Sequence, residues 1–380
     1  MNRNTLFLVV LALVALMATP SFAQSSSVVE FHGFGGWALG KTDGLKYSFG
    51  TQEGQYDNAE MAINASARPM EQLSIVSQIR FDSNSQRGGA DLDYAFAEWA
   101  FSDAAKIRMG RVKHPFGIYG EVFDVGTLRP FYSLPASLYG ANGFTARAYN
   151  GAGLTGNLSR GRWGLQYDLY AGQIEGDFEA PGLLTATSAN FAEPNIRFSY
   201  RVEDTVGGRL NISTPIDGLT VGGSGYSGEA FTDLDNVSTA RRDVYAAHVE
   251  FIRSSLTIRS EYGHLKNGTD FSADASYVEL SYRLREKWQL SARLDSQDVS
   301  VNVNPANLPK IFPQLLENKE KALGLSYWFT PGLVVRASWH HIDGNRFAFP
   351  ERSEDVLRAL QTGELDRTTD MLVVGAQFSF

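Results

Sequence analysis

The C-terminal segment of the chain alternates apolar and polar positions with a period of two. From residue 369 to the end, one face carries Leu372, Val374, Ala376, Phe378 and Phe380. A strand that crosses a bilayer needs roughly 9 to 11 residues, alternates lipid-facing with lumen-facing side chains, and places aromatic rings at the interface. This segment therefore predicts a membrane-crossing strand that ends in an aromatic anchor.

The same alternation, bounded by turn residues, recurs along the whole chain. It predicts sixteen strands, at 29–40, 57–68, 72–83, 90–101, 105–113, 146–158, 162–174, 204–214, 218–228, 241–252, 255–266, 273–284, 287–298, 319–330, 332–343 and 368–380. Their connections alternate short and long, as in antiparallel strands whose two termini lie at the end with the short turns. We predict an all-β fold, a transmembrane antiparallel β-barrel of sixteen strands, which is wide enough to enclose water.

Segment 90–101 departs from the regular alternation. Asp91 and Asp93 have the parity of Trp99 and Phe101, so one face would carry both carboxylates and lipid-facing aromatic rings. An extra residue in one strand shifts the parity of everything before it. The segment therefore predicts a β-bulge or a displaced register.

The N-terminus has the three parts of a secretory signal peptide. A short basic stretch at 2–4 precedes an apolar stretch at 6–18, and small residues at 21–23 precede a cleavage point. The apolar stretch is shorter than the roughly 20 residues of a spanning helix. We expect a signal peptide at 1–23 and a single transmembrane β-barrel domain at 24–380.

Composition bears on the class of membrane protein, the kinds of site and the partners that the chain can have. The mean hydropathy of −0.20 suits a barrel, in which only alternate residues meet lipid, better than a helical membrane protein. The chain has no cysteine, which excludes a disulfide scaffold, a thiolate nucleophile and Cys-based metal sites. A formal net charge of −8 gives a nucleic-acid partner little electrostatic support.

One long connection, at 114–140, is rich in Phe, Tyr and Leu. Standing in solvent, such a loop would expose a large apolar patch. We therefore expect it to fold into the barrel lumen.

Several motifs stand out along the chain: MGRVKHPFG at 109–117, Arg-Pro at 129–130, YNGAGL at 149–154, GGRL to TPIDGLTVG at 207–222, and the terminal Phe380. In these motifs the chain resembles the trimeric porins of Gram-negative outer membranes, and within them the branch related to the phosphate-selective and other 16-stranded porins.

The resemblance implies a channel in the outer membrane for passive diffusion of small hydrophilic solutes or ions, reached after export. It also implies a third extracellular loop bent inward as a constriction, and a homotrimer embedded in outer-membrane lipid. Phe380 would be the signal read by the outer-membrane assembly machinery. No cofactor and no catalytic residue are implied.

A constriction with an electric field across it needs charges of opposite sign on facing walls. Glu121 and Asp124 of the long loop are the acidic candidates. The basic candidates lie on or beside neighbouring strands, and they are Arg80, Arg108, Arg111, Lys113 and Arg147. The alternative is that these groups only pin the loop to the wall by ion pairs.

Strand parity assigns further charges to the lumen. The basic ones are Arg209, Arg259, Arg283, Arg293 and Arg336; the acidic ones are Glu60, Asp168, Glu250, Glu261, Glu279 and Asp295. Their signs nearly balance, so they leave anion and cation selectivity open. Solvated cross-strand pairs explain such residues more simply than a dedicated binding ladder.

Two other functions compete with a pore. A barrel hydrolase would need a nucleophile and a base, for which Ser133, Ser137 and His114 are the available side chains, without a supporting motif. A structural barrel plugged by its own loops would conduct almost no ions.

Two remaining features carry little chemistry. His340 and His341 are adjacent on one strand and so point to opposite faces, which argues against a shared metal site. The stretch 353–363 reads as a short helix with Ser353 as N-cap and Gly363 as the closing residue, within the last long loop.

Overall fold

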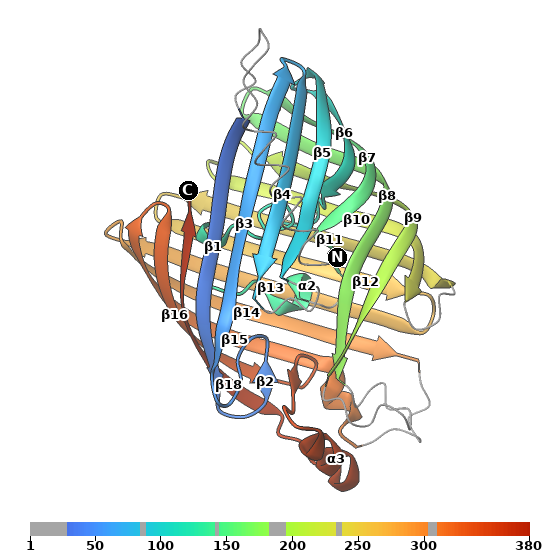
Figure 1. Cartoon of the computed structure of the whole chain (residues 1–380), viewed down its shortest axis with the longest axis vertical. Coiled ribbons are helices and arrows are strands. Elements are labelled where there is room, and N and C mark those ends of the chain that lie inside the picture. The colour runs from blue at the N-terminus through green and yellow to red at the C-terminus, as the bar shows by residue number, and fades with distance from the viewer. Residues whose placement is uncertain (1–28, 84–88, 141–143, 182–194, 233–237, 303–309) are drawn as a thin grey trace, which may run out of the picture.

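The computed structural model describes residues 29–83, 89–140, 144–181, 195–232, 238–302 and 310–380. The expected signal peptide lies outside the described residues. Among the described residues, sixteen strands form one closed antiparallel barrel whose order follows the sequence (Figure 1), which confirms the predicted fold. The barrel strands are β1 (Val29–Thr42), β3 (Gln55–Met70), β4 (Leu73–Asp82), β5 (Ala90–Ser102), β6 (Ala105–Lys113), β7 (Ala148–Arg160), β8 (Trp163–Pro181), β9 (Asn195–Ser213), β10 (Leu219–Thr232), β11 (Ser238–Arg253), β12 (Leu256–Asn267), β13 (Phe271–Leu284), β14 (Trp288–Val301), β15 (Glu317–Thr330), β16 (Leu333–Asp343) and β18 (Thr368–Ser379).

The barrel closes where its first strand meets its last. β1 pairs with β18, and beyond the last ladder pair the amide of Gly33 donates to the carbonyl of Phe380 at 3.0 Å while the amide of Phe380 donates back at 2.8 Å. Both strand ends therefore lie at the short-turn end of the barrel. At that end the turn before β10 requires a glycine, because Gly218 has a φ of 86° and an added Cβ would lie 2.0 Å from the carbonyl oxygen of Ile252.

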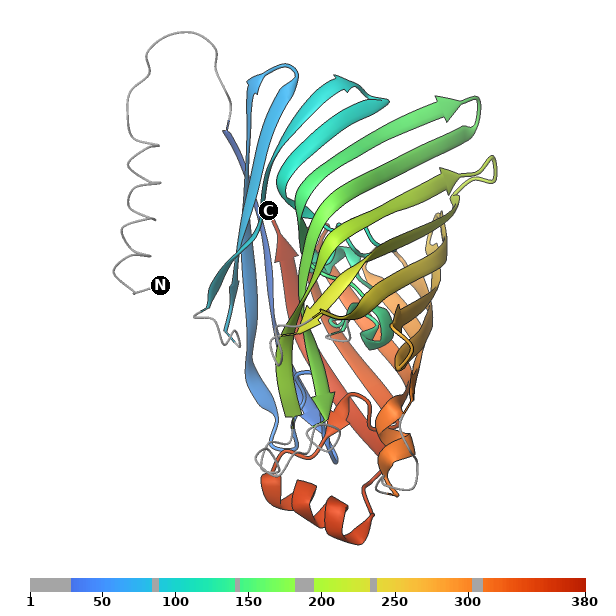
Figure 2. The same cartoon turned by 90° about the vertical axis from the view of Figure 1, so that its right-hand side faces the viewer.

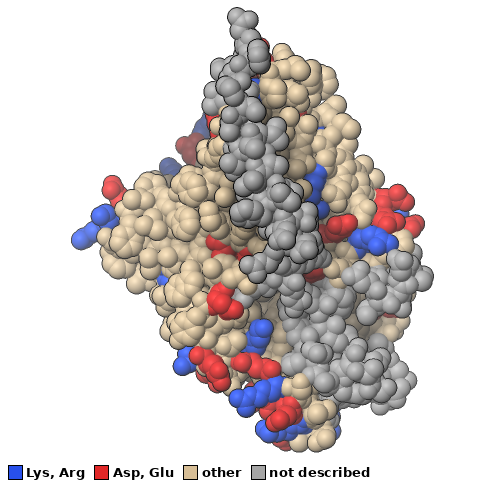
Figure 3. Space-filling view, in the orientation of Figure 1, with Lys and Arg blue, Asp and Glu red and all other residues tan. Residues whose placement is uncertain are grey.

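Alternation separates an apolar outer face from a polar inner face. On β14 the outward Leu294 is 59% exposed, whereas its inward neighbours Arg293 and Asp295 are buried. Across much of the wall seen in Figure 3 charged side chains are sparse, and they gather toward the lower end of the view, where the long loops lie. The outer face is thus suited to lipid and the inner face to water and ions.

The irregularity expected in 90–101 is a β-bulge. In the β4–β5 ladder Gln78 pairs with Tyr94 but Ile79 pairs with Leu92, so Asp93 has no partner residue. Asp93 points into the barrel and is buried. The parity conflict in the sequence therefore marks a real extra residue.

Strands β8 and β9 are longer than predicted, with 19 residues each instead of segments 162–174 and 204–214. Their ladder contains a register shift between Gly172 and Ile174, and Asp204 has a φ of 48°. The shift interrupts the alternation from which the strands were predicted, so the outer part of this hairpin was missed.

Loops at the long-loop end fold against one another. Strand β2 (Lys46–Tyr47) pairs with β17 (Ala348–Phe349), and helix α3 (Ser353–Thr362) packs on the short helix η4 (Phe312–Leu316). Helix α3 ends at Gly363 as predicted, but its N-cap is residue 352 rather than Ser353. Among the described residues, no helix is long and apolar enough to cross a membrane.

The described residues of the connection between β6 and β7, 114–140 and 144–147, are here called the inner loop. It carries the short helices η1 (Gly126–Leu128) and α2 (Ala136–Tyr139), and both views place it within the barrel (Figures 1 and 2). Phe116, Tyr119 and Leu138 of this loop are buried in the same cluster as lumen-facing tyrosines of the wall. The aromatic loop is therefore folded into the lumen, as expected from its composition.

Candidate functional site in the lumen

The inner loop is tied to one side of the wall by a buried set of charges, here called the bulge clamp: Asp93, Lys113, Asp124 and Arg147. The Nζ of Lys113 lies 3.0 Å from Oδ2 of Asp93 and also bonds Asp124, which bonds Arg147 as well. Gln78 donates to Asp93 at 2.7 Å. Burial opposes ionisation of Asp124, but Lys113 and then Arg147 outweigh it and hold the pKa of this carboxyl well below its usual range.

Glu121 belongs to a second set of alternating charges. Its carboxylate bonds the buried Arg209 and lies 3.6 Å from Nη1 of Arg108. Arg209 also bonds Asp168 at 2.8 Å, and Arg108 bonds Glu98 at 2.7 Å. Burial raises the pKa of Glu121, but Arg209 and Arg108 lower it further, so the net pKa lies below the usual value. Unlike Asp124, Glu121 keeps about a third of its side chain (31%) exposed.

The structure thus brings together Glu121 with Arg108, and Asp124 with Lys113 and Arg147, out of the predicted set. It does not bring Arg80 or Arg111 to either acid. Arg80 bonds Asp82 at 2.7 Å and lies 3.7 Å from Asp91. Arg111 has the outward parity of the exposed Met109 and lies 3.9 Å from Glu175. Pinning of the loop, the alternative reading, describes the contacts of Asp124 well.

On one side of the lumen the exposed charges have the reverse of the expected arrangement. On the β3–β5 side of the wall the partly exposed lumen carboxylates are Glu60, Asp82 and Asp91, at 30%, 31% and 35%. The inner loop faces them with basic groups: Arg129 lies 3.3 Å from Glu60, and Arg147 is 33% exposed. Here the wall is the acidic partner and the loop is the basic one.

On the opposite side of the lumen, carboxylates from four consecutive strands β12 to β15 form what we call the acid row. Its members are Glu261, Glu279, Asp295 and Glu320. All four are buried. Glu261, Glu279 and Asp295 each accept a hydrogen bond from the inner loop, whereas Glu320 accepts one from Tyr47 of β2. The first three were predicted to face the lumen from parity alone.

The predicted lumen arginines also point inward, and four of them contact the inner loop. Arg209 bonds Glu121 of the loop, and the other three contact its backbone. Arg336 donates to the carbonyl of Arg129 at 2.6 Å, and Arg293 donates to the carbonyl of Ser133 at 3.1 Å. Arg259 lies 3.3 Å from the carbonyl of residue 128. Arg283, near the short-turn end, lies over the ring of Trp328 at 4.7 Å.

The side chains considered for a hydrolase are engaged separately. Ser137 bonds Asp295, Ser133 lies by Arg293, and His114 bonds Tyr170 at 2.7 Å. Burial lowers the pKa of His114 to about 3, so it is neutral at physiological pH. No contact among the described residues joins this histidine to either serine, as a nucleophile and base would require.

The adjacent histidines point to opposite faces as predicted. His340 is buried and lies 2.7 Å from Glu320, whereas His341 stacks outside on Trp339. Within the described ranges, no group of three or more His, Asp or Glu side chains is placed to hold a metal ion.

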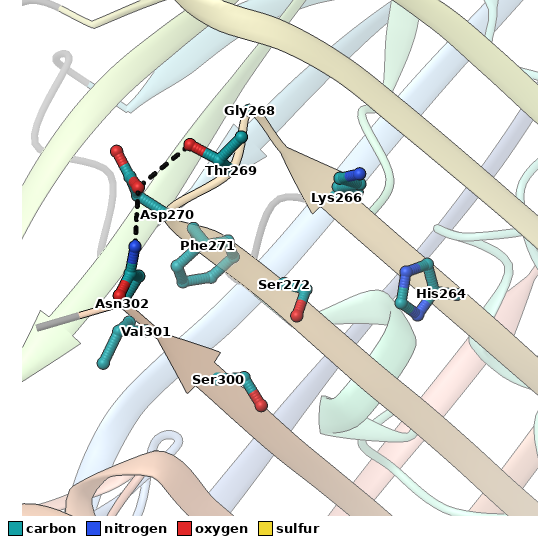
Figure 4. Close-up of a pocket in the computed structure, with 10 residues that line it drawn as sticks. All are labelled: His264, Lys266, Gly268, Thr269, Asp270, Phe271, Ser272, Ser300, Val301 and Asn302. Carbon is teal, nitrogen blue, oxygen red and sulfur yellow. Dashed lines mark hydrogen bonds between the residues drawn. The ribbon is translucent and has the colours of Figure 1, made fainter.

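A cavity of about 420 Å³ lies at the long-loop end of β12, β13 and β14 (Figure 4). His264, Lys266, Ser272 and Ser300 line it. They share the parity of exposed outer residues such as Leu294. The cavity therefore lies on the outer wall, away from the inner loop.

Several residues of the lumen site are not among those predicted from the sequence. Asp93 had a detectable signal, because its parity conflict marked the bulge. Glu320 follows the lumen parity of its strand and could have been included with the other acids. The donors Tyr119 and Tyr139 gave no signal, because their partners depend on how the inner loop folds.

Comparison with known proteins concerns the whole barrel. No protein-family model and no curated protein sequence matches the chain. Among solved structures, OmpF of Salmonella typhi in complex with daunomycin is similar with a TM-score of 0.60 at 12% identity, over 93% of this chain and 98% of that one. An anion-selective porin from Comamonas acidovorans gives 0.56 at 10% identity, over 93% and 100%. A trimer form of OmpT, an outer membrane protein of Vibrio cholerae, gives 0.55 at 12% identity, over 94% and 100%. At these identities the likeness concerns the fold: the chain has a porin-like 16-stranded barrel.

Proposed function

We propose that this chain forms a water-filled channel of the outer membrane, through which small hydrophilic solutes or ions diffuse. The observation that carries the proposal is a set of opposite charges that face each other in the lumen. Glu60, Asp82 and Asp91 on the wall and Arg147 on the inner loop are partly exposed, and the buried Arg129 of the loop lies 3.3 Å from Glu60. A barrel built only to be filled has no need for partly exposed charges that face each other across its lumen. Fixed charges on both sides of a narrow passage bias permeation by charge and dipole.

The fold supports this function by analogy. The solved structures that resemble the barrel include one described as an anion-selective porin. The polar lumen and apolar outer wall suit a transmembrane barrel of the Gram-negative outer membrane. Porin-like barrels of one fold pass different solutes, so the solute of this channel is a matter for experiment.

Single-channel recording of the purified, folded protein in planar bilayers tests the proposal. We expect discrete conductance steps in salt solution, and a reversal potential in a salt gradient that depends on the exposed lumen charges. A folded, heat-resistant barrel that adds no conductance would refute it.

A loop-plugged structural barrel is the second candidate, and one observation favours it. The inner loop is bonded to opposite sides of the lumen, through Gln78 and Glu60 on one side and through Glu279 and Asp295 on the other. A loop held this way could fill the whole cross-section. Removing residues 126–140 separates the two functions, because a plugged barrel would gain conductance from none, whereas a pore would widen from a measurable starting value.

Several finer features belong to the same proposal. We infer export by a signal peptide at 1–23, a single barrel domain at 24–380, insertion by the assembly machinery through Phe380, and a homotrimer; the trimer form of OmpT supports the last. Kinship with the phosphate-selective branch stays a prediction of the sequence. A phosphate-to-chloride permeability ratio well above one would support it.

A further inference from the structure

The acid row places more carboxylates in one dry site than the nearby cations balance. Asp295 on β14 and Glu320 on β15 are directly opposite each other in the ladder. Both are buried at about 3% exposure. Like charges directly opposite on neighbouring strands repel each other, and burial strengthens the repulsion.

One arginine serves most of the row. The Nε of the fully buried Arg293 lies 3.6 Å from Glu279 and 3.8 Å from Glu320. The other titratable groups packed against the row are Arg259 on β12, which also bonds Glu250, His248 on β11, His340 on β16, Tyr277 on β13 and Tyr47 on β2. Even with both arginines counted, the four carboxylates outnumber the permanent positive charges.

The inner loop covers this row and supplies its hydrogen-bond donors. Tyr119 donates to Glu279, and Tyr139 donates to Glu261. The amide of residue 118 donates to Glu261 at 2.9 Å, and the amide of residue 137 donates to Asp295 at 3.1 Å. The loop thereby removes water from the carboxyl groups that hold it.

We propose that the acid row is a proton-dependent latch, which holds the inner loop against β12 to β15 while it retains protons and releases the loop when it is fully ionised. Proton binding to the row and docking of the loop are thermodynamically linked. Docking of the loop desolvates the row and so favours its protonated form, whereas undocking returns the row to water and favours the ionised form. Protons and the docked loop therefore stabilise each other, and raising the pH favours undocking.

The two tyrosines of the loop that donate to the acid row stay protonated while the row ionises. Burial, followed by the charge of the facing glutamate, raises the pKa of Tyr119 and of Tyr139 well above the usual value. Both phenols stay donors, so the pH response arises in the wall. On the far side of the lumen the bulge clamp is balanced, with Lys113 and Arg147 facing Asp93 and Asp124. Release is thus confined to the half of the loop that contains α2.

The absence of native cysteine allows a direct probe of loop position. Leu138 in α2 is 0% exposed when the loop is docked, whereas Leu128 in η1 is 51% exposed. We would place a single cysteine at each site, Leu138→Cys and Leu128→Cys, in the full folded barrel. The ratio of their labelling rates with a maleimide cancels the effect of pH on the thiol itself.

From about pH 5 to about pH 9 we expect this ratio to rise about tenfold or more, because ionisation of the row weakens docking. Adding Asp295→Asn, which keeps an acceptor for Ser137 but cannot ionise, should reduce the rise to about twofold or less. The matched control is Asp82→Asn, a lumen carboxylate bonded to Arg80 on the opposite side from the acid row, and it should leave the rise intact.

A ratio that stays constant in the parent barrel overturns the latch, even if the Asp295→Asn protein fails to fold. A rise that survives Asp295→Asn overturns it as well. The proposal rests on the proposed channel only for its physiological effect: labelling that follows pH in a barrel without conductance would keep the latch and reject the channel. If both hold, conductance should rise with pH in the parent and not in Asp295→Asn.

Discussion

The Nζ of Lys113 lies 3.0 Å from Oδ2 of Asp93, a carboxylate that a β-bulge turns into the lumen. Both side chains are buried, and Asp124 of the inner loop bonds the same ammonium group. Without the extra residue in β5, the side chain at 93 would follow the outward parity of Trp99. The bulge therefore supplies one of the two carboxylates that Lys113 bonds. The other, Asp124, belongs to the inner loop, so Lys113 joins the loop to the bulge.

Replacing Asp93 tests that role. We expect Asp93→Asn to lower the free energy of unfolding by about 1 to 3 kcal/mol, because a charge-assisted hydrogen bond to a buried ammonium is lost. Urea unfolding of the barrel in lipid vesicles measures it. Asp91→Asn is the matched control, since Asp91 lies on the same strand with its side chain 35% exposed and should cost well under half as much. Equal effects at the two positions would contradict the clamp.

The fold was predictable because the strands of a membrane barrel can be recognised from the local alternation of apolar and polar residues. Each strand presents its outer face to one environment and its inner face to another, so the pattern needs no knowledge of distant residues. The same rule assigned Arg293 and Glu279 to the lumen, and both contact the inner loop. It failed at β8 and β9, where a register shift near Gly172 interrupts the period.

The site was less predictable because its contacts depend on the path of the inner loop. The sequence identified Glu121 and Asp124 as loop acids, but their partners come from distant strands: Glu121 bonds Arg209 on β9. Arg80 on β4 and Arg111 on β6 were expected to face these acids. Instead, Arg80 bonds Asp82, and Arg111 points to the outer wall. A charge can be assigned to a face from its parity, whereas its partner across a lumen requires coordinates.

Glu121 offers a test of ion selectivity. Glu121→Gln should shift the permeability ratio toward anions, because Arg108 and Arg209 lose part of their compensation and guanidinium stays charged at accessible pH. The shift should be largest at low salt, where screening is weakest. Reversal potentials in a salt gradient measure it. A shift toward cations, or none, would mean that Glu121 does not face the ion path.

Arg80 provides the opposite sign without touching the loop. Arg80→Gln removes the guanidinium beside Asp82 and Asp91 and leaves this part of the lumen one positive charge poorer, so permeation should move toward cations. Because no described contact joins Arg80 to the inner loop, the free energy of unfolding should change by only about 0 to 1 kcal/mol, as for a partly exposed pair. Loss of conductance without a change in selectivity would argue that the passage lies elsewhere in the lumen.

Acid should release the clamp side of the loop only at unusually low pH. The pKa of Asp124 and of Glu121 is depressed in the folded barrel, through Lys113 and Arg209 above all. A carboxyl group whose pKa is lower in the folded state than in the unfolded state stabilises the fold fully when the pH is above its unfolded-state pKa. This stabilisation is lost as the pH falls through its folded-state pKa. The contribution of these two carboxylates to the apparent melting temperature should therefore stay level down to about pH 4 and be lost below it. In Asp124→Asn the level should be lower and the acid fall shallower; an unchanged acid limb would contradict the assignment.

Phe380 separates assembly from stability. Its ring is 65% exposed on the outer wall, so Phe380→Ala, which keeps both backbone hydrogen bonds to Gly33, should cost well below the about 1.5 to 3 kcal/mol of a fully buried ring. If the terminal aromatic residue is read during insertion, the amount of protein in the outer membrane should nevertheless fall several-fold. Phe378→Ala is the matched control, because Phe378 stacks on Phe380 at 6.4 Å and lies on the same face but is not terminal. Membrane yield and heat resistance are measured side by side for both variants. Equal yields, with equal small losses of heat resistance, would show that Phe380 acts through packing alone.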